Sequence, residues 1–496
     1  MTAVPDLVGP VAGDPAGARE LRADIRHWRR GRVSTSWLEA AQDAYVAVFA
    51  TLMIGAMAGN VVLHLRRMAV DECVAAACRT GRATAPWLAV PVVLALVVAA
   101  ARLVGPVSVT PAVASWVLPA PTDRAAVLRP RLVTAVAAAT VSAALVSGLA
   151  AAVAGVPVAV TASLAVGTAA LAGGAVGFCA WAQARHEGVS RAAGGSLAGL
   201  AWLVLVFLAV GRVPPPPSPS TGVWTAALVA VTAASILALV GGWRALAVVP
   251  GRSVATAGAL APSLSGALAA MDLALIWDVL HARRWRSRGW VRPLRGRWRG
   301  PLALAERDLA RLRRKPSLLV TPAAALVVPY VGATLGGQRV VVFLAAMTGF
   351  VACLGLFSGI RVLRRTSILE RCLPLQPAEA GLAAIAVPML VVLAWGLAVA
   401  PALHGVPSGL AGLVAGLAAT TACVRWMVAR PPDYRMPLVS SPGGAIPPAL
   451  IGALFRGLDV ILLTTGPLLL VPTENGALVS LLVGGLTLSV LLSRRP

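Results

Sequence analysis

Charged residues are scarce in this sequence, and lysine is almost absent. Only 12% of the 496 residues are charged, about half the share in an ordinary soluble domain, while 58% are hydrophobic. A soluble enzyme of ordinary composition is therefore excluded. A Walker A loop places a lysine after a glycine-rich turn so that it reaches the nucleotide phosphates. The one lysine, Lys315, lies between Arg314 and Pro316, so the chain has no P-loop.

Other catalytic and metal-binding patterns are also lacking. The five histidines are scattered, and His186-Glu187 is not followed by the second histidine of a zinc protease. We therefore expect no enzyme activity, no cofactor and no metal site. Cys179, Cys353 and Cys423 lie in apolar runs, where cysteine acts as a small buried hydrophobic residue.

Long apolar runs are abundant. A helix needs about 20 apolar residues to cross about 30 Å of hydrocarbon, and about twelve such runs can be found. Several are rich in small residues, which let helices approach closely. We expect an all-α integral membrane protein, a bundle of about twelve transmembrane helices. The expected spans are 43–63, 87–104, 132–154, 157–182, 195–211, 223–242, 318–336, 339–357, 381–401, 408–428, 449–471 and 476–492.

Positive charge is in excess, and its distribution predicts the orientation. The 43 basic and 19 acidic residues give a net charge of +24. With the N-terminus inside, roughly 35 of the 43 basic residues fall in cytoplasmic segments, as the positive-inside rule requires. Residues 1–42 have no apolar h-region, which predicts an uncleaved first span. We expect a multi-pass protein of the cell inner or plasma membrane with both termini in the cytoplasm.

The first expected external loop contains two cysteines, Cys73 and Cys78. An extracytoplasmic loop is oxidising, so a disulfide bond can form there. Two unpaired small residues are an equally good interpretation of the sequence.

The order of features indicates an internal duplication. An Asp-Ile or Asp-Leu pair followed by Arg-Arg precedes the first span of each half, at residues 24–30 and 308–314. A Leu-Pro motif with a second proline follows the second span of each half, and chance recurrence is the alternative. An even number of spans in each half makes the two six-helix repeats parallel. The expected regions are an N-terminal cytoplasmic segment (1–42), a first half (43–242), a basic amphipathic cytoplasmic linker (243–317) and a second half (318–496).

The linker contains arginines interleaved with tryptophans over residues 283–299. Such a pattern can bind single-stranded nucleic acid by stacking and charge. A helix lying on a bilayer with anionic headgroups, with its tryptophans at headgroup level, is the favoured interpretation.

Charged residues within an expected span are the remaining signal, because they are costly in lipid. Arg456 and Asp459 are three residues apart in the expected span 449–471, on one face of a helix. Asp459 would lie about 15 Å deep if that helix began near Ala449. A polar hinge or cavity lining is the functional interpretation, and a self-compensating structural pair is slightly favoured over it.

Two segments resemble known membrane proteins. Val107–Pro111, Trp116–Arg124 and Leu128–Pro130 resemble the loop after the second span in ABC-2-type exporter membrane subunits. Met436–Gly444 with Arg456–Asp459 resembles an uncharacterised actinobacterial family of ABC-permease-like polytopic proteins. The resemblance implies a permease subunit that works with a separate ATP-binding subunit, itself a dimer.

In such a subunit, cytoplasmic segments would contact the ATPase. Segments 105–131 and 358–380 occupy equivalent positions in the two halves, and ordinary interfacial loops are the alternative. A secondary transporter is a weaker interpretation, because charged residues in the spans are few and the Gly-x-x-x-Asp-Arg motif of major facilitator proteins is absent. A non-transporting scaffold or immunity protein is a third, and a lipid-modifying enzyme is the least favoured. The candidate coupling residues are Leu118, Pro119, Pro121, Arg124, Glu370, Leu373, Pro374 and Pro377.

Overall fold

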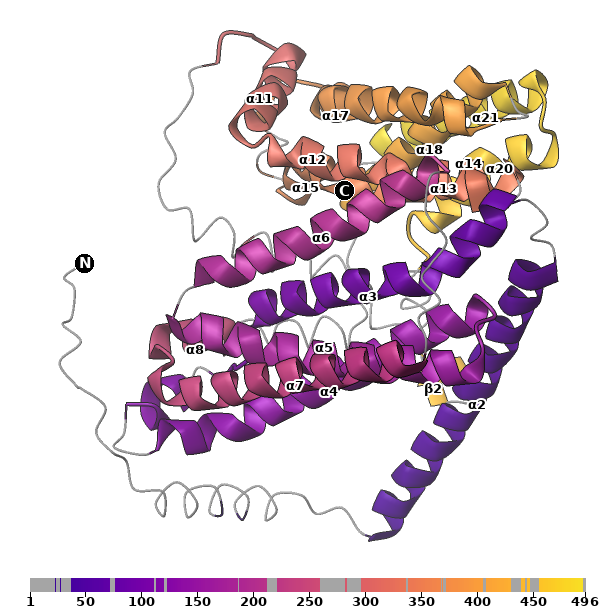
Figure 1. Ribbon diagram of the computed structural model, residues 1–496. Coiled ribbons are helices and arrows are strands. Elements are labelled where there is room, and N and C mark those ends of the chain that lie inside the picture. Colours follow the sequence, from indigo (N-terminus) through magenta and orange to yellow (C-terminus); the bar gives the residue numbers. More distant parts are fainter. Residues whose placement is uncertain are drawn as a thin grey trace. The chain divides into compact units, whose positions relative to one another are not determined.

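A computed structural model gives the fold (Figure 1). Apart from one short hairpin, the secondary structure of the described residues is helical. The structure describes residues 37–71, 76–110, 113–119, 123–185, 187–211, 221–258, 296–335, 338–366, 372–404, 407–429, 439–441, 444–446 and 455–493, with the single residues 23, 27, 282 and 368.

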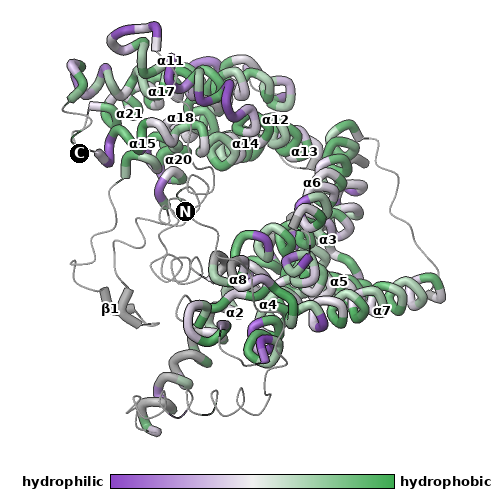
Figure 2. Tube along the Cα trace, turned by 90° about the vertical axis from the view of Figure 1, so that its left-hand side faces the viewer, coloured by the Kyte–Doolittle hydropathy of each residue, from purple (hydrophilic) through white to green (hydrophobic). Residues whose placement is uncertain are grey.

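Ten helices in this part of the chain are long and apolar enough to cross a membrane, which indicates a multi-pass membrane protein. They overlap ten of the twelve expected spans, and hydrophobic residues dominate their length (Figure 2). The other two expected spans, 43–63 and 449–471, coincide with the shorter apolar stretches Thr51–His64 and Leu458–Leu470.

The chain forms two compact units, which are described separately. The first contains Met1–Val204 and Pro214–Gly266, and the second contains Leu205–Val213 and Ala267–Pro496. The helices that begin in the first unit are α2 (Trp37–Asp71), α3 (Ala76–Val104), η1 (Val113–Val117), α4 (Arg124–Val153), α5 (Val158–Arg185), α6 (Glu187–Ala209), α7 (Thr221–Ala245), η2 (Leu246–Val248) and α8 (Gly251–Gly258).

The second unit contains one small hairpin besides its helices. Strands β1 (Val439–Ser441) and β2 (Gly444–Ile446) pair antiparallel. The helices are α11 (Pro301–Arg314), α12 (Ser317–Ala325), α13 (Val327–Leu335), α14 (Gln338–Cys353), η3 (Leu354–Phe357), α15 (Ser358–Arg365), α17 (Pro377–Val399), η4 (Ala400–Ala402), α18 (Ser408–Val428), α20 (Leu458–Leu470) and α21 (Glu474–Ser493).

Four helices in each unit pack in the same pattern. In the first unit α5 contacts α3, α4 and α7, and α3 and α7 also contact α4. In the second unit α18 contacts α14, α17 and α21, and α14 and α21 also contact α17. We call these two sets the first and second quartets. The central helix of each quartet is the most buried candidate span of its unit, and it holds many small residues that permit close packing.

Glycines bring the backbones together at different places in the two quartets. In the first, Gly177 of α5 faces α7, where an added Cβ would lie 2.7 Å from Ala238 O. Gly242 of α7 in turn has no room for a Cβ beside Gly177. In the second, Gly412 of α18 lies against Gly396 of α17, and an added Cβ would lie 2.6 Å from its carbonyl oxygen.

A break between α12 and α13 is stabilised by a tryptophan. Leu326 N donates to Ala323 O at 3.3 Å instead of closing the α-helical bond to Pro322. The freed Pro322 oxygen accepts a hydrogen bond of 2.9 Å from Trp395 Nε1 of α17. This bond satisfies a carbonyl that would be costly to leave unpaired in a membrane.

Two cysteine expectations can be assessed. Cys179, Cys353 and Cys423 are buried free thiols, as expected from their apolar surroundings. Cys78, near the start of α3, is disulfide-bonded. Cys73 lies outside the described residues.

Candidate functional site

In the first unit, the chain between α3 and α4 folds back against the end of its quartet. Val107, Val109 and Leu118 are at most 5% exposed and pack with the start of α4, the end of α5 and η2. Arg124 Nε donates to Leu118 O at 3.2 Å. Asp123 caps α4 by accepting a 2.9 Å hydrogen bond from Ala125 N. The segment is therefore fixed at both ends.

The expected coupling residues of this segment have different environments. Leu118 is buried, so it anchors the segment, whereas Pro119 and Arg124 are exposed. Pro121 lies outside the described residues. Trp116, which was part of the motif but not singled out, is 81% exposed and is the most prominent side chain here.

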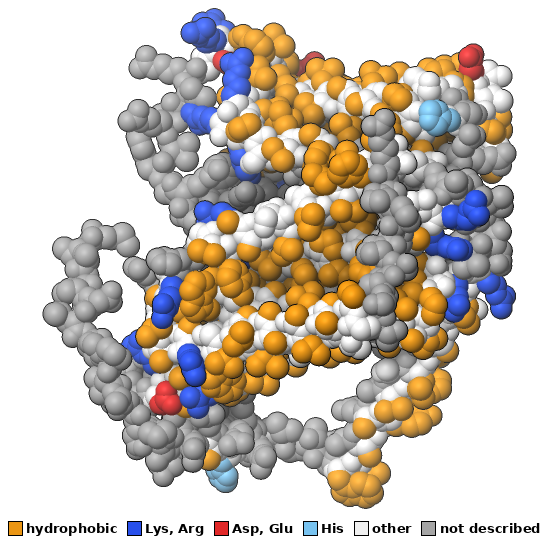
Figure 3. All heavy atoms as spheres, viewed as in Figure 1, with side chains coloured by type: hydrophobic (Ala, Val, Ile, Leu, Met, Phe, Trp, Pro, Cys, Tyr) orange, Lys and Arg blue, Asp and Glu red, His pale blue; other side chains and the backbone are white. Residues whose placement is uncertain are grey.

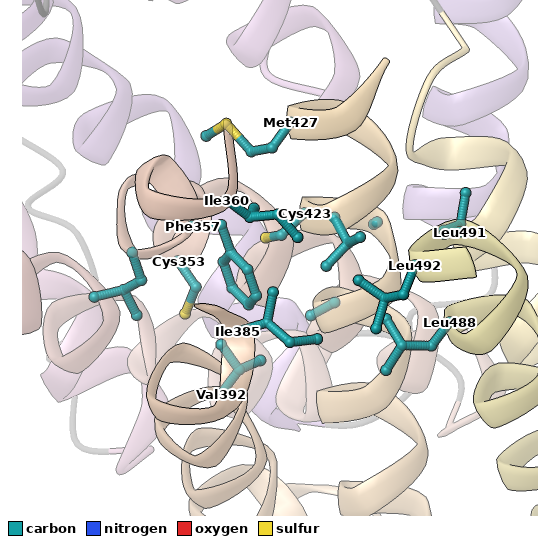
Figure 4. Packing of buried hydrophobic residues seen from close by; sticks show 14 of the residues in the cluster. Cys353, Phe357, Ile360, Ile385, Val392, Cys423, Met427, Leu488, Leu491 and Leu492 are labelled. Atoms are coloured by element: carbon teal, nitrogen blue, oxygen red, sulfur yellow. The ribbon is translucent and has the colours of Figure 1, made fainter. Parts of the chain in front are cut away.

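In the second unit, η3 and α15 occupy the equivalent position after α14. Leu356, Phe357, Ile360 and Leu363 are at most 1% exposed. Figure 4 shows Phe357 and Ile360 pointing into a cluster with Ile385 of α17, among other residues. The cluster also contains the end of α18 and the end of α21. Thus the segment that follows α3 and the segment that follows α14 pack against the corresponding end of their quartets.

The second segment differs from the first because it carries buried arginines. Arg361 and Arg364 of α15 are each 5% exposed. Arg364 Nη2 donates to Pro377 O at 3.3 Å and also to Leu492 O, which joins α15 to the start of α17 and the end of α21. Arg361 Nη1 lies 3.9 Å from Met427 Sδ of α18. At Leu492 a guanidinium is suitable because it satisfies a carbonyl at the C-terminus of α21 and interacts favourably with the helix dipole there.

The amphipathic helix α11 is fastened to the same segment. Arg311 Nη1 donates to Ser358 Oγ at 2.7 Å, and Arg311 Nη2 donates to Leu356 O. Asp308, only 1% exposed, lies 3.4 Å from Arg307 Nη2 and 3.9 Å from Arg311 Nη1. Gly359 leaves room for this carboxylate, since an added Cβ would lie 3.0 Å from Asp308 Oδ1.

Burial dominates the electrostatics of this ion pair. It raises the pKa of Asp308 above its ordinary value, while Arg311 and Arg307 oppose the shift. Burial likewise lowers the pKa of Arg311, and Asp308 opposes that change. Asp308 Oδ2 and Arg311 Nε are buried and have no hydrogen-bond partner among the residues that the structure describes. The contact therefore holds α11 in place at an electrostatic cost.

The expected coupling residues of the second segment lie beside this cluster. Leu373 is half-buried and packs against it, Pro374 is exposed, and Pro377 is half-buried and offers its carbonyl to Arg364. Glu370 lies outside the described residues. Cys372 is an exposed free thiol in this segment.

The expectation that Arg456 and Asp459 lie in one continuous helix needs correction, whereas their pairing stays a prediction. The helix α20 begins at Leu458, so Asp459 is in its first turn and Arg456 precedes it. Asp459 Oδ2 lies 3.5 Å from Arg425 Nε of α18. Asp459 Oδ1 accepts from Gly457 N and Val460 N, a capping role that the span boundary could not reveal. The depth of about 15 Å assumed a continuous helix from Ala449, and residues 449–454 lie outside the described part of the chain, so the depth stays a prediction.

Sequence reasoning missed the buried arginines and Asp308 as site residues. Asp308 belongs to the repeated Asp-Leu and Arg-Arg pattern, which gives no sign that this carboxylate is buried. The three-residue spacing of Arg361 and Arg364 was the available signal, because it places both on one side of a helix. Within the described ranges, no group of three His, Cys, Asp or Glu residues could hold a metal ion.

Together the fold and these contacts indicate a helical, multi-pass membrane protein. In each unit a segment packs against one end of the quartet. A family of unknown function, DUF6297, matches residues 78–437, and the chain belongs to this family. The description of this family names no activity. No curated protein and no solved structure matches the chain.

Proposed function

We propose that the chain is the transmembrane permease subunit of an ABC-type exporter, driven by a separate ATP-binding subunit. One observation carries the proposal. The segment after α3 and the segment after α14 pack against the corresponding end of the first and second quartets. In this scheme segments 105–131 and 358–380 contact an ATPase dimer, one in each half. ATP binding would favour one of two packings of the helices.

The proposal includes twelve spans in two parallel six-helix repeats. The shared contact pattern of α3, α4, α5 and α7 with α14, α17, α18 and α21 supports it, because these are the second, third, fourth and sixth expected spans of each half. The two shorter apolar stretches would complete the count.

Both termini are proposed to be cytoplasmic, in the cell membrane. Two observations support this orientation. The basic residues concentrate on the side of both segments. The disulfide at Cys78 belongs to the opposite, oxidising side. The basic linker, whose residues 283–295 lie outside the described part, would rest on anionic headgroups.

The exposed thiol of Cys372 allows a direct test. A photoreactive maleimide on Cys372 of the full chain, purified in mild detergent from its host, should cross-link to a P-loop ATPase. The control is the double variant Cys372→Ser, Thr473→Cys, because Thr473 is exposed at the other end of the second unit. That variant should give no such cross-link.

Other results would contradict the proposal. Cross-linking of the ATPase from both positions, or from neither, would remove the coupling role. Transport by liposomes driven by an ion gradient without ATP would favour a secondary transporter. A host phenotype that persists after loss of the ATPase would favour a scaffold or immunity protein.

A further inference from the structure

The helix α11 packs against α17 in the second unit. Its Leu304 packs in one cluster with Ala380 and Ala384 of α17. Ala384 is seven residues into the span that begins at Pro377, a depth of about 10 Å. Amphipathic helices in the membrane interface lie about 5–10 Å into the headgroup and acyl boundary. If Pro377 marks the membrane boundary, this part of α17 lies within that layer.

The outer surface of α11 and the residues before it have the composition of a membrane-surface helix. Trp298 is 49% and Leu302 is 61% exposed, and Arg299, before the helix, and Arg313, in its last turn, are exposed as well. Basic side chains gather on α11 at the upper left of Figure 3. Tryptophan and arginine are typical of the headgroup layer on the cytoplasmic side.

Acidic groups offset only part of this charge. Between residues 296 and 315 the acids are Glu306 and the buried Asp308. The Glu306 carboxylate accepts hydrogen bonds of 3.0 and 2.9 Å from Arg297 N and 2.9 Å from Trp298 N. It is therefore engaged in holding the preceding residues against α11.

We infer that α11 binds anionic phospholipid headgroups through Arg299 and Arg313, and that this binding positions α15. The second part follows from the bonds of Arg311 to Ser358 and to Leu356 O, because they fasten α11 to the start of α15. The inference rests on the proposed contact of the basic linker with anionic headgroups and deepens it by naming the arginines and their link to α15, and it requires no ATPase. A membrane lipid would then influence the position of segment 358–380, which contains Cys372.

The test is a titration of short-chain phosphatidylglycerol into the purified full chain in neutral detergent. The thermal unfolding midpoint should rise to saturation. In the double variant Arg299→Gln, Arg313→Gln the half-saturating concentration should increase by about 30-fold, from about 1 kcal/mol for each arginine near an anionic surface. Arg66→Gln, Arg67→Gln, two exposed arginines of α2, is the matched control and should behave as the wild type.

Inorganic phosphate at matched concentrations separates a lipid from a free anion, and an equal rise with phosphate would overturn the lipid assignment. An equal increase of the half-saturating concentration in the Arg299, Arg313 variant and in the Arg66, Arg67 variant would show general charge attraction and overturn the site. The labelling rate of Cys372 by a maleimide should change on addition of phosphatidylglycerol, and not in the Arg299, Arg313 variant. An unchanged rate in the wild type would overturn the link to α15.

Discussion

In each unit a segment packs against the corresponding end of a similar quartet, but the side chains that make this contact are aliphatic in the first unit and partly charged in the second. In the first, Val107, Val109 and Leu118 seal the end with aliphatic side chains. In the second, the seal contains Arg361 and Arg364 and is fastened to α11 by Asp308 and Arg311. Aliphatic packing tolerates small displacements, whereas buried hydrogen-bonded charges need fixed geometry. In the second unit, a displacement of α15 would therefore be transmitted to several helices.

The largest expected effect is on Asp308. The variant Asp308→Ala removes a buried carboxylate and leaves the half-buried Arg311 without it, and should lower the free energy of unfolding by about 3 kcal/mol. The counterpart in the first unit, Asp123→Ala, removes only a helix cap and should cost about 1 kcal/mol. Unfolding of the full chain in mixed micelles measures both. Equal losses would contradict the contrast between the two closures.

The glycine contacts should give the next largest effect. Gly242→Ala in the first quartet and Gly412→Ala in the second force tightly packed backbones apart, at about 2 kcal/mol each. Gly241 and Gly409 have open space around the position of a Cβ, so alanine there should be neutral or stabilising by up to about 1 kcal/mol. The same unfolding assay applies. A loss for Gly241→Ala matching that for Gly242→Ala would argue against close packing of α5 and α7.

The smallest expected effect is on the pH dependence of the second unit. The pKa of Asp308 is raised in the folded state, so its protonated form is favoured by folding. Its contribution to stability is full below the unfolded pKa and is lost as the pH rises through the raised folded value. The wild type should therefore lose stability relative to Asp308→Asn as the pH increases from about 4. Parallel pH profiles of the unfolding midpoint for the two proteins would contradict this.

Hydropathy was enough to predict the helices, because ten of the expected runs are helices of spanning length. It failed at Asp459, because apolar residues before Leu458 extended the expected span past the start of α20. It also could not predict that Leu118 is buried while Trp116 is exposed, since both lie in one short motif and only tertiary packing distinguishes them. Arg364 was hidden for the same reason, because its partners Pro377 and Leu492 are distant in sequence.

The burial of α18 has a consequence for how the protein is made. Of the ten candidate spans it is the most buried and the least hydropathic, with Thr420 and Thr421 fully buried. Such a segment gains little from lipid alone. During synthesis α14 and α17 emerge before it, and α20 and α21 after it. We expect α18 to enter the bilayer against the two helices that precede it, so that changes weakening α17 would reduce insertion of α18 before any folded protein exists.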